Sequence, residues 1–174
     1  VVDGFIVAVS EETQKLKEFS HFENALNDEK HIVMFDRVID SVPCTKVITN
    51  DYKAISETTN NLIKSNRNQI VLVSAINNLN VGMQRTNGYS KAMIEAKLKP
   101  VVIEANRDEI QKALKNYVVN NSVDAIIALD TDSSFVAYKV ASELKKNIPN
   151  DIAVIGYMSE HIASYLTPGL STIN

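Results

Sequence analysis

Short apolar runs alternate along the chain with longer stretches in which apolar residues recur every three or four positions. Continuous apolar runs are expected of strands in a parallel sheet that is covered on both faces, and they predict strands over residues 5–9, 32–35, 46–49, 70–73, 101–103, 125–129 and 152–155. The periodic stretches predict amphipathic helices over residues 11–28, 52–65, 82–97, 108–120 and 132–146. Strands that alternate with helices form βαβ units, whose right-handed crossovers place helices on both faces of a parallel sheet. The predicted class is therefore α/β.

A polar stretch at residues 65–68 divides this pattern into two series. We predict that residues 1–66 form part of an N-terminal lobe and that residues 67–166 form a C-terminal lobe. The extended tail, residues 167–174, is expected to cross back toward the first lobe.

Composition narrows the class of protein. Of the 174 residues, 45% are hydrophobic and 22% are charged, which is ordinary for a globular domain. The net charge is −3, and the sequence shows no stripe of Lys and Arg. Because nucleic-acid-binding modules carry a basic face, we do not expect this segment to bind DNA. Cys44 is the sole cysteine, which excludes an intramolecular disulfide and fits a reducing compartment.

Two features of the chain as a linear sequence add to this picture. No apolar run approaches the roughly 20 residues that a membrane span needs. The chain opens on Val1 without an initiator Met or a basic leader, which predicts a piece of a longer protein.

Polar residues cluster directly after the predicted strands. Ligands of open parallel sheets bind outside the carboxyl ends of the strands. The residues at those ends are Ser10, Asp36, Arg37, Asn50, Asp51, residues 74–78, Asn106, Arg107, residues 130–132 and residues 158–161. Carboxylates and amides bond to hydroxyls, and Arg donates in a planar fork, so the set suits a sugar or another small polar ligand. The same residue types are also favoured as turn formers and helix caps without any ligand.

Arg85 lies near the start of the predicted helix 82–97, close enough to the sheet edge for its side chain to reach over it. The alternative is a charge on a solvated helix face.

Motifs for catalysis or metal binding are missing from the sequence. It contains no glycine-rich nucleotide loop, nucleophile elbow or zinc-protease motif, and none of His21, His31 and His161 has an obvious catalytic nucleophile beside it. Asp130 and Asp132 bring acidic groups together without a His, a Cys or the spacing of a calcium loop. We therefore expect neither an enzyme nor a metal or cofactor site.

Seven motifs, taken in order, resemble those of the lactose-repressor (LacI) family of bacterial transcription regulators. They are residues 2–7 (VDGFIV), 33–37 (VMFDR), 42–52 (VPCTKVITNDY), 84–89 (QRTNGY), 124–128 (DAIIA), 148–157 (IPNDIAVIGY) and 166–173 (LTPGLSTI). No single motif is diagnostic, but the match extends over essentially the whole chain.

The resemblance implies a two-lobed periplasmic-binding-protein-like fold of type I, with parallel sheets, an incomplete N-terminal lobe and a small-molecule effector in the cleft. It implies a cytoplasmic homodimer that reaches operator DNA through a headpiece absent from this chain. The chain is then the effector-binding and dimerisation domain of a repressor, sensing a sugar or sugar derivative without turnover.

Site residues follow from the resemblance position by position. Arg85 matches the family's effector-gripping Arg, and Asp36 matches a carboxylate of the cleft. Asn50 falls where many members carry Asp, and Asp130 falls beside a position that holds a ligand hydroxyl. Met158 departs from the pattern, because members usually carry Asp there; either Glu160 substitutes for it or the ligand lacks that polar contact.

Two other functions remain open on the sequence. A periplasmic sugar-binding receptor would have the same lobes but a signal peptide upstream. An enzyme on a Rossmann-like sheet would be recognised by turnover of a sugar or a nucleoside.

Overall fold

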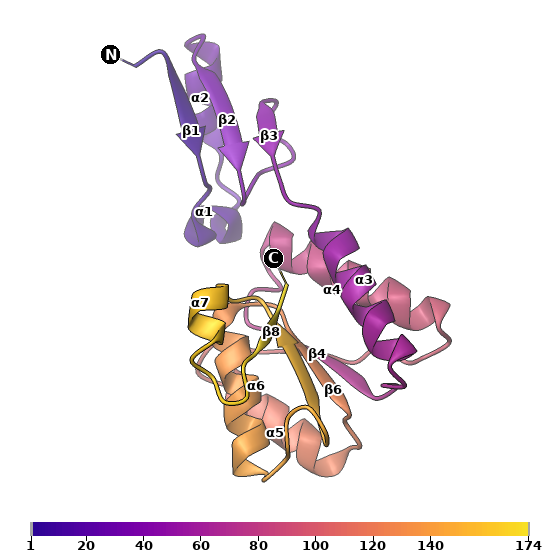
Figure 1. Ribbon diagram of the computed structural model, residues 1–174. Helices are drawn as coiled ribbons and strands as arrows, with labels where there is room; N and C mark the ends of the chain where they lie inside the picture. Colours follow the sequence, from indigo (N-terminus) through magenta and orange to yellow (C-terminus); the bar gives the residue numbers. More distant parts are fainter. Residues whose placement is uncertain (1, 174) are drawn as a thin grey trace.

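The computed structural model describes residues 2–173, which form two parallel α/β bodies (Figure 1). The first body holds a three-stranded sheet of order β1-β2-β3, formed by Gly4–Val7, His31–Phe35 and Thr45–Val47. The second holds a five-stranded sheet of order β5-β4-β6-β7-β8. Its strands are β4 (Ile70–Ser74), β5 (Val102–Glu104), β6 (Ala125–Ala128), β7 (Ala153–Gly156) and β8 (Ser171–Thr172). Every strand pair is parallel, which confirms the predicted class.

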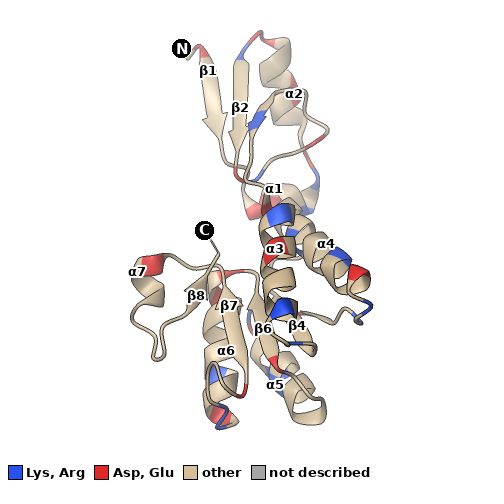
Figure 2. Cartoon of the chain, turned by 45° about the vertical axis from the view of Figure 1, so that its right-hand side comes forward, with Lys and Arg blue, Asp and Glu red and all other residues tan. Residues whose placement is uncertain are grey.

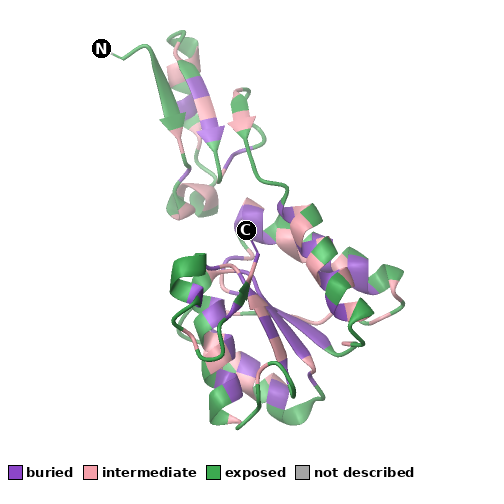
Figure 3. Ribbon diagram, viewed as in Figure 1, coloured by how far each residue is buried: buried purple, intermediate pink, exposed green. Residues whose placement is uncertain are grey.

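Helices cover both faces of the second sheet. The helices of the described residues are α1 (Glu11–Leu16), α2 (Ser20–Asn27), α3 (Asp51–Lys64), α4 (Asn80–Glu95), α5 (Ile110–Asn120), α6 (Thr131–Glu143) and α7 (Glu160–Ala163). Side chains of α3 and α4 pack on one face of the sheet, and side chains of α5 and α6 pack on the other. All residues of β4 and β6 are buried (Figure 3), as their continuous apolar runs predict.

The single helix expected over residues 11–28 is two helices. Lys17 adopts a left-handed conformation with φ of 55° and ends α1, a common way for a helix to stop. Leu16, an apolar residue of the predicted helix, is 77% exposed, while Phe22 of α2 is buried. The break therefore lets α2 turn its own apolar side toward the first sheet.

The packing differs from the predicted lobe boundary at residue 66. Ile55 and Leu62 of α3 lie in one buried cluster with Ile70 and Leu72 of β4, so α3 belongs to the second body. The division falls between the end of β3 and the start of α3. The polar stretch 65–68 only connects a helix to a strand. In the tail, β8 pairs with β7 in the second sheet, and Ile173 after it lines the same hollows as Asp36 of the first body. The predicted crossing back toward the first lobe stays a prediction, and Val1 and Asn174 lie outside the described residues.

The first body is covered on one side only. Phe22 of α2 joins Ile32 and Met34 of β2 in a buried cluster, whereas Ile6 is 80% exposed and Val47 is 59% exposed. Parallel sheets are normally buried on both faces, so these apolar side chains fit the predicted incompleteness of the N-terminal lobe. None of the helices within residues 2–173 has the length and apolar character of a membrane span.

Tyr89 of α4 links β4 to the segment that leads into β5. Its buried hydroxyl donates to the carbonyl of Ile70 at 2.8 Å and accepts from the backbone N–H of Val101 at 2.9 Å. Burial raises the pKa of Tyr89 to about 12. The neutral hydroxyl is therefore the form that the folded state stabilises.

We expect Tyr89→Phe to lower the free energy of unfolding by about 1–3 kcal/mol at neutral pH, because two buried groups lose their partner. The raised pKa of Tyr89 stabilises the folded state. This stabilisation is fully present below the pKa of the unfolded state, near 10, and is lost as pH rises through the folded-state pKa of about 12. Urea unfolding at pH 8 and pH 11 should thus show the gap between wild type and variant narrowing at the higher pH. A gap that widens would contradict this account.

Candidate functional site

A cavity of about 590 Å³ lies between the two bodies at the carboxyl ends of their strands, within the range of small-molecule sites. Its charged lining residues are Glu11, Asp36 and Arg37 of the first body and Arg85, Arg107 and Asp130 of the second. The structure thus brings the predicted residues Asp36, Arg85 and Asp130 to one hollow. Their binding of a ligand stays a prediction.

Arg85 is held rigidly in the cavity wall. Its Nε lies 2.6 Å from Oδ1 of Asp51, and its Nη1 donates to the carbonyl of Leu129 at 2.7 Å. Its guanidinium carbon lies 3.5 Å from the ring centroid of Tyr157, a cation–π geometry. With 14% of its side chain exposed, Arg85 is not a solvated helix charge. It offers its remaining donors in a fixed orientation.

Asp51 belongs to the site, although the sequence analysis predicted its neighbour Asn50 as the ligand-binding residue. Its carboxylate, 7% exposed, pairs with Arg85 and accepts from Thr49 Oγ1 at 2.7 Å and from the Tyr157 hydroxyl at 3.3 Å. Burial, together with the charge of Asp51 and against the charge of Arg85, raises the pKa of Tyr157 to about 12. The available signal was an acid directly before the predicted helix 52–65, where a negative charge is favoured.

Asn50 is the N-cap residue of α3. Its side chain accepts from the backbone N–H of Lys53 at 3.1 Å and caps α3. It lines an adjoining hollow of about 570 Å³, which shares Asp36, Arg85 and Tyr157 with the main cavity. Asn50 therefore lies beside the main cavity rather than in its wall.

Asp130 uses its oxygens within the protein. It accepts from the backbone N–H and the hydroxyl of Ser133, at 2.8 and 2.7 Å, and from the backbone N–H of Ala75 at 3.1 Å. These bonds cap α6 and join the ends of β4 and β6. The helix-cap alternative thus describes Asp130 correctly, although the residue also lines the cavity.

Asp36 stands at the end of β2 with a left-handed φ of 58°. Its backbone N–H donates to the carbonyl of Val47 at 3.1 Å, which holds the turn in place. Asp36 is exposed and lines both hollows.

The loop after β7 places Met158, not Glu160, at the cavity. Met158 is 6% exposed and lines the cavity together with Ser159. Ser159 caps α7, and Glu160 is the first residue of that helix, outside the described residues that line either hollow. The structure therefore gives no support to a substitution of Glu160 for the missing carboxylate.

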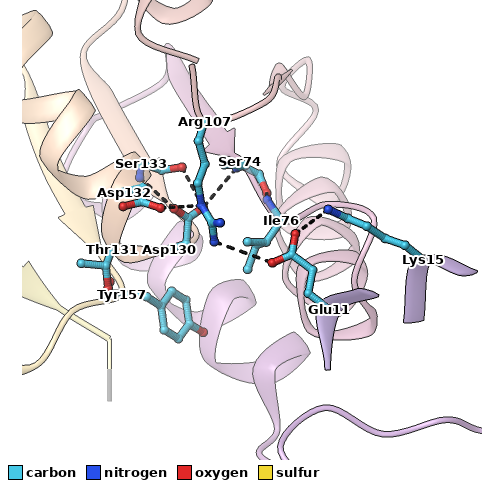
Figure 4. A network of polar contacts seen from close by, with 11 residues as sticks. Glu11, Lys15, Ser74, Ile76, Arg107, Asp130, Thr131, Asp132, Ser133 and Tyr157 are labelled. Carbon is cyan, nitrogen blue, oxygen red and sulfur yellow. Dashed lines mark hydrogen bonds and ion pairs between the residues drawn. The ribbon is translucent and has the colours of Figure 1, made fainter. Parts of the chain in front are cut away.

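A network of charges joins the two bodies at the cavity (Figure 4). Arg107 Nε lies 2.7 Å from Asp132 Oδ2, and Arg107 Nη2 lies 3.7 Å from Glu11 Oε2. Glu11 in turn receives a bond of 2.6 Å from Lys15 Nζ. A second link runs from Gln14 Nε2 to Asn80 Oδ1, at 2.8 Å.

Charges of both signs gather where α1 approaches the second body (Figure 2). The bond from Lys15, together with the positive charges of Lys15, Arg107 and Arg37, lowers the pKa of the Glu11 carboxyl. Glu11 therefore stays ionised in this network.

Two parallel α/β bodies that share a polar cavity at their strand ends define a two-lobed ligand-binding domain. The family of periplasmic binding protein-like domains matches residues 59–174, and the chain belongs to that family. Its resemblance to the effector-binding core of LacI-family regulators is also confirmed.

Curated relatives are repressors that are longer than this chain. The HTH-type transcriptional repressor PurR of Vibrio campbellii is 30% identical over 181 residues, which cover 99% of this chain and 52% of PurR. The probable HTH-type transcriptional repressor ExuR of Bacillus subtilis is 26% identical over 149 residues, which cover 82% of this chain and 44% of ExuR. The chain thus spans about half the length of these relatives.

Solved structures share the fold. A LacI family transcriptional regulator from Enterococcus faecium with bound ribose has a TM-score of 0.82 at 20% identity, over 98% of this chain and 64% of that one. The transcription regulator CcpA of Lactococcus lactis has a TM-score of 0.76 at 19% identity, over 98% of this chain and 63% of that one.

Proposed function

We propose that this chain is the effector-binding and dimerisation core of a LacI-type transcriptional regulator. In this proposal a small polar molecule, a sugar or sugar derivative, binds between the lobes and controls operator binding. The observation that carries the proposal is the shared cavity, which has hydrogen-bonding side chains from both bodies in its wall. The relatives named above are repressors rather than transport receptors, which favours a cytoplasmic regulator over a periplasmic receptor.

The proposed mechanism is reversible binding without turnover. An effector that contacts both lobes favours one relative orientation of the two, and it shifts the equilibrium only by its differential affinity for the two states. The links that such a change would remake are those between Glu11 and Arg107 and between Gln14 and Asn80. A homodimer would pass the change to DNA-binding headpieces, whose separation must match the spacing of the operator half-sites.

A thermal-shift screen of the intact protein against neutral and charged sugars tests the proposal, because a ligand that binds the native state raises its stability. A hit should also change operator affinity in a gel-shift assay. Release of a chemically altered product from any hit would instead favour an enzyme.

We expect Arg85→Ala to abolish the shift produced by any hit, which is worth about 2.7 kcal/mol at a ligand concentration of 100 Kd. The reason is that Arg85 is held with donors directed at the cavity. Thermal melts with and without ligand give the measurement. Lys91→Ala, on the same helix and 56% exposed, is the matched control and should retain the full shift.

Arg85→Lys covers the case in which the alanine variant does not fold. Lysine keeps a positive charge for Asp51 but lacks the planar fork, so we expect a folded protein with a weakened shift. An unchanged ligand shift in both variants would remove Arg85 from the site.

A further inference from the structure

The charged side chains in the cavity wall differ in how far other groups of the protein already bind them. The guanidinium of Arg85 is neutralised by Asp51, and the carboxylate of Asp130 accepts three hydrogen bonds. Two other arginines line the cavity. Arg107 has partners that are exposed or distant, and Nε of Arg37 has no hydrogen-bond partner within the described residues. The chemistry that a ligand meets there depends on these two arginines.

Arg107 is held by contacts that a ligand can exchange. Its side chain is 60% exposed, its partner Asp132 is 52% exposed, and its distance to Glu11 is 3.7 Å. Exposed ion pairs of this kind contribute little to stability, so giving one up for a ligand costs little. Arg107 also has a planar fork that can bind a carboxylate or a phosphate with two parallel hydrogen bonds.

Arg37 has donor capacity that the protein does not use. Its Nε is buried and makes no hydrogen bond within the described residues, while the residue as a whole is partly exposed and lines the cavity. A buried donor without a partner is costly. An anionic group at the cavity side of this guanidinium would not bond to the buried Nε, but its charge would favour the cation.

The protein already places one carboxylate among these cations. Glu11 is bonded to Lys15 at 2.6 Å and faces Arg107, and the charges of Lys15, Arg107 and Arg37 all favour its ionised form. This corner of the cavity is therefore suited to a negative group. At the loop after β7, on the opposite wall, the buried Met158 lines the cavity at the position where the LacI pattern has an acid. This position therefore supplies no carboxylate to the cavity.

We infer that the effector is a polyhydroxylated molecule with a carboxylate or phosphate group, which Arg37 and Arg107 bind at the corner next to Glu11. The inference rests on the proposed function and specifies its ligand. The ligand's acid replaces Glu11 as the partner of Arg107, and Glu11 keeps Lys15. Arg85 and Asp36 face the ligand's hydroxyl groups.

Matched ligands test the charge preference on the intact protein by isothermal titration calorimetry. The neutral probes are D-glucose, D-galactose and D-ribose. Each is compared with its uronic acid (glucuronate, galacturonate, riburonate), which keeps the sugar ring, and with its terminal phosphate. We expect at least one anionic member to bind 10-fold or more tightly than its neutral parent, and added salt to weaken that preference. The arm that binds identifies the group as carboxylate or phosphate.

Variants assign the preference to residues. Arg107→Gln and Arg37→Gln should each lower the ratio of acid to neutral affinity by about 10-fold, the loss expected of one charge-assisted bond. Glu11→Gln should raise that ratio, because it removes a competing carboxylate. The matched control is Lys115→Gln, which breaks an exposed ion pair of 2.7 Å to Glu143 outside both hollows and should leave the ratio unchanged.

The outcomes separate the inference from the function on which it rests. Neutral sugars that bind as tightly as their acids, in a manner that depends on Arg85, would overturn the inference and leave the sensor proposal standing. An acid preference that survives both arginine variants would overturn the assignment to Arg37 and Arg107. Failure of every probe to bind would overturn both proposals for sugar-like ligands.

Discussion

Asp51→Ala is expected to lower the free energy of unfolding by about 3 kcal/mol. The substitution leaves the Arg85 guanidinium, with 14% of its side chain exposed, without its carboxylate partner, and breaking a buried ion pair from one side has a cost of this order. It also removes the acceptor for Thr49 and Tyr157. Urea unfolding measures the change, and the ligand shift should disappear because Arg85 loses its fixed position.

Two controls distinguish this effect from a general loss of charge. Asp132→Ala removes the exposed partner of Arg107 and should change stability by less than about 1 kcal/mol. The double variant Asp51→Ala with Arg85→Met removes the unpaired charge and should recover part of the loss. Equal losses in Asp51→Ala and Asp132→Ala would show that the Asp51–Arg85 pair has no special place in the fold.

Gly88→Ala is expected to destabilise the protein by about 2–3 kcal/mol, the cost of overpacking a close contact. A Cβ at Gly88 would come within 3.0 Å of the carbonyl oxygen of Tyr52, so α3 and α4 approach as closely as they do only because position 88 has no side chain. Pushing the helices apart would also move Asp51 away from Arg85. Thermal unfolding and the ligand shift should therefore both decline.

Gly169→Ala is the matched glycine control. Its added Cβ would meet its nearest atom, the carbonyl oxygen of Ala163, at 3.9 Å, an ordinary contact. Its stability should stay within about 0.5 kcal/mol of wild type, as for most surface changes. A Gly88 variant as stable as the Gly169 variant would mean that the two helices can separate without cost.

The sequence by itself determined the parallel α/β architecture and the edge at which the polar residues meet. Continuous apolar runs predict β4 and β6 correctly, because a strand buried on both faces has no polar side to display. The carboxyl ends of the strands of one parallel sheet share an edge, which predicts Asp36 at the edge of the first sheet and Asp130 at the edge of the second. The resemblance to two-lobed regulators predicts that both edges face one hollow, as they do.

Only the tertiary structure decided which of these polar residues bond to other groups of the protein and which face the cavity. Asn50 and Asp51 are adjacent in the chain, yet one caps a helix and the other is the buried partner of Arg85. Arg85 owes its orientation to Asp51, Leu129 and Tyr157. These partners come from separate elements, and no local pattern encodes their distances. The same reason moved the lobe boundary, since the partners of Ile55 and Leu62 lie on a sheet that begins beyond the polar stretch.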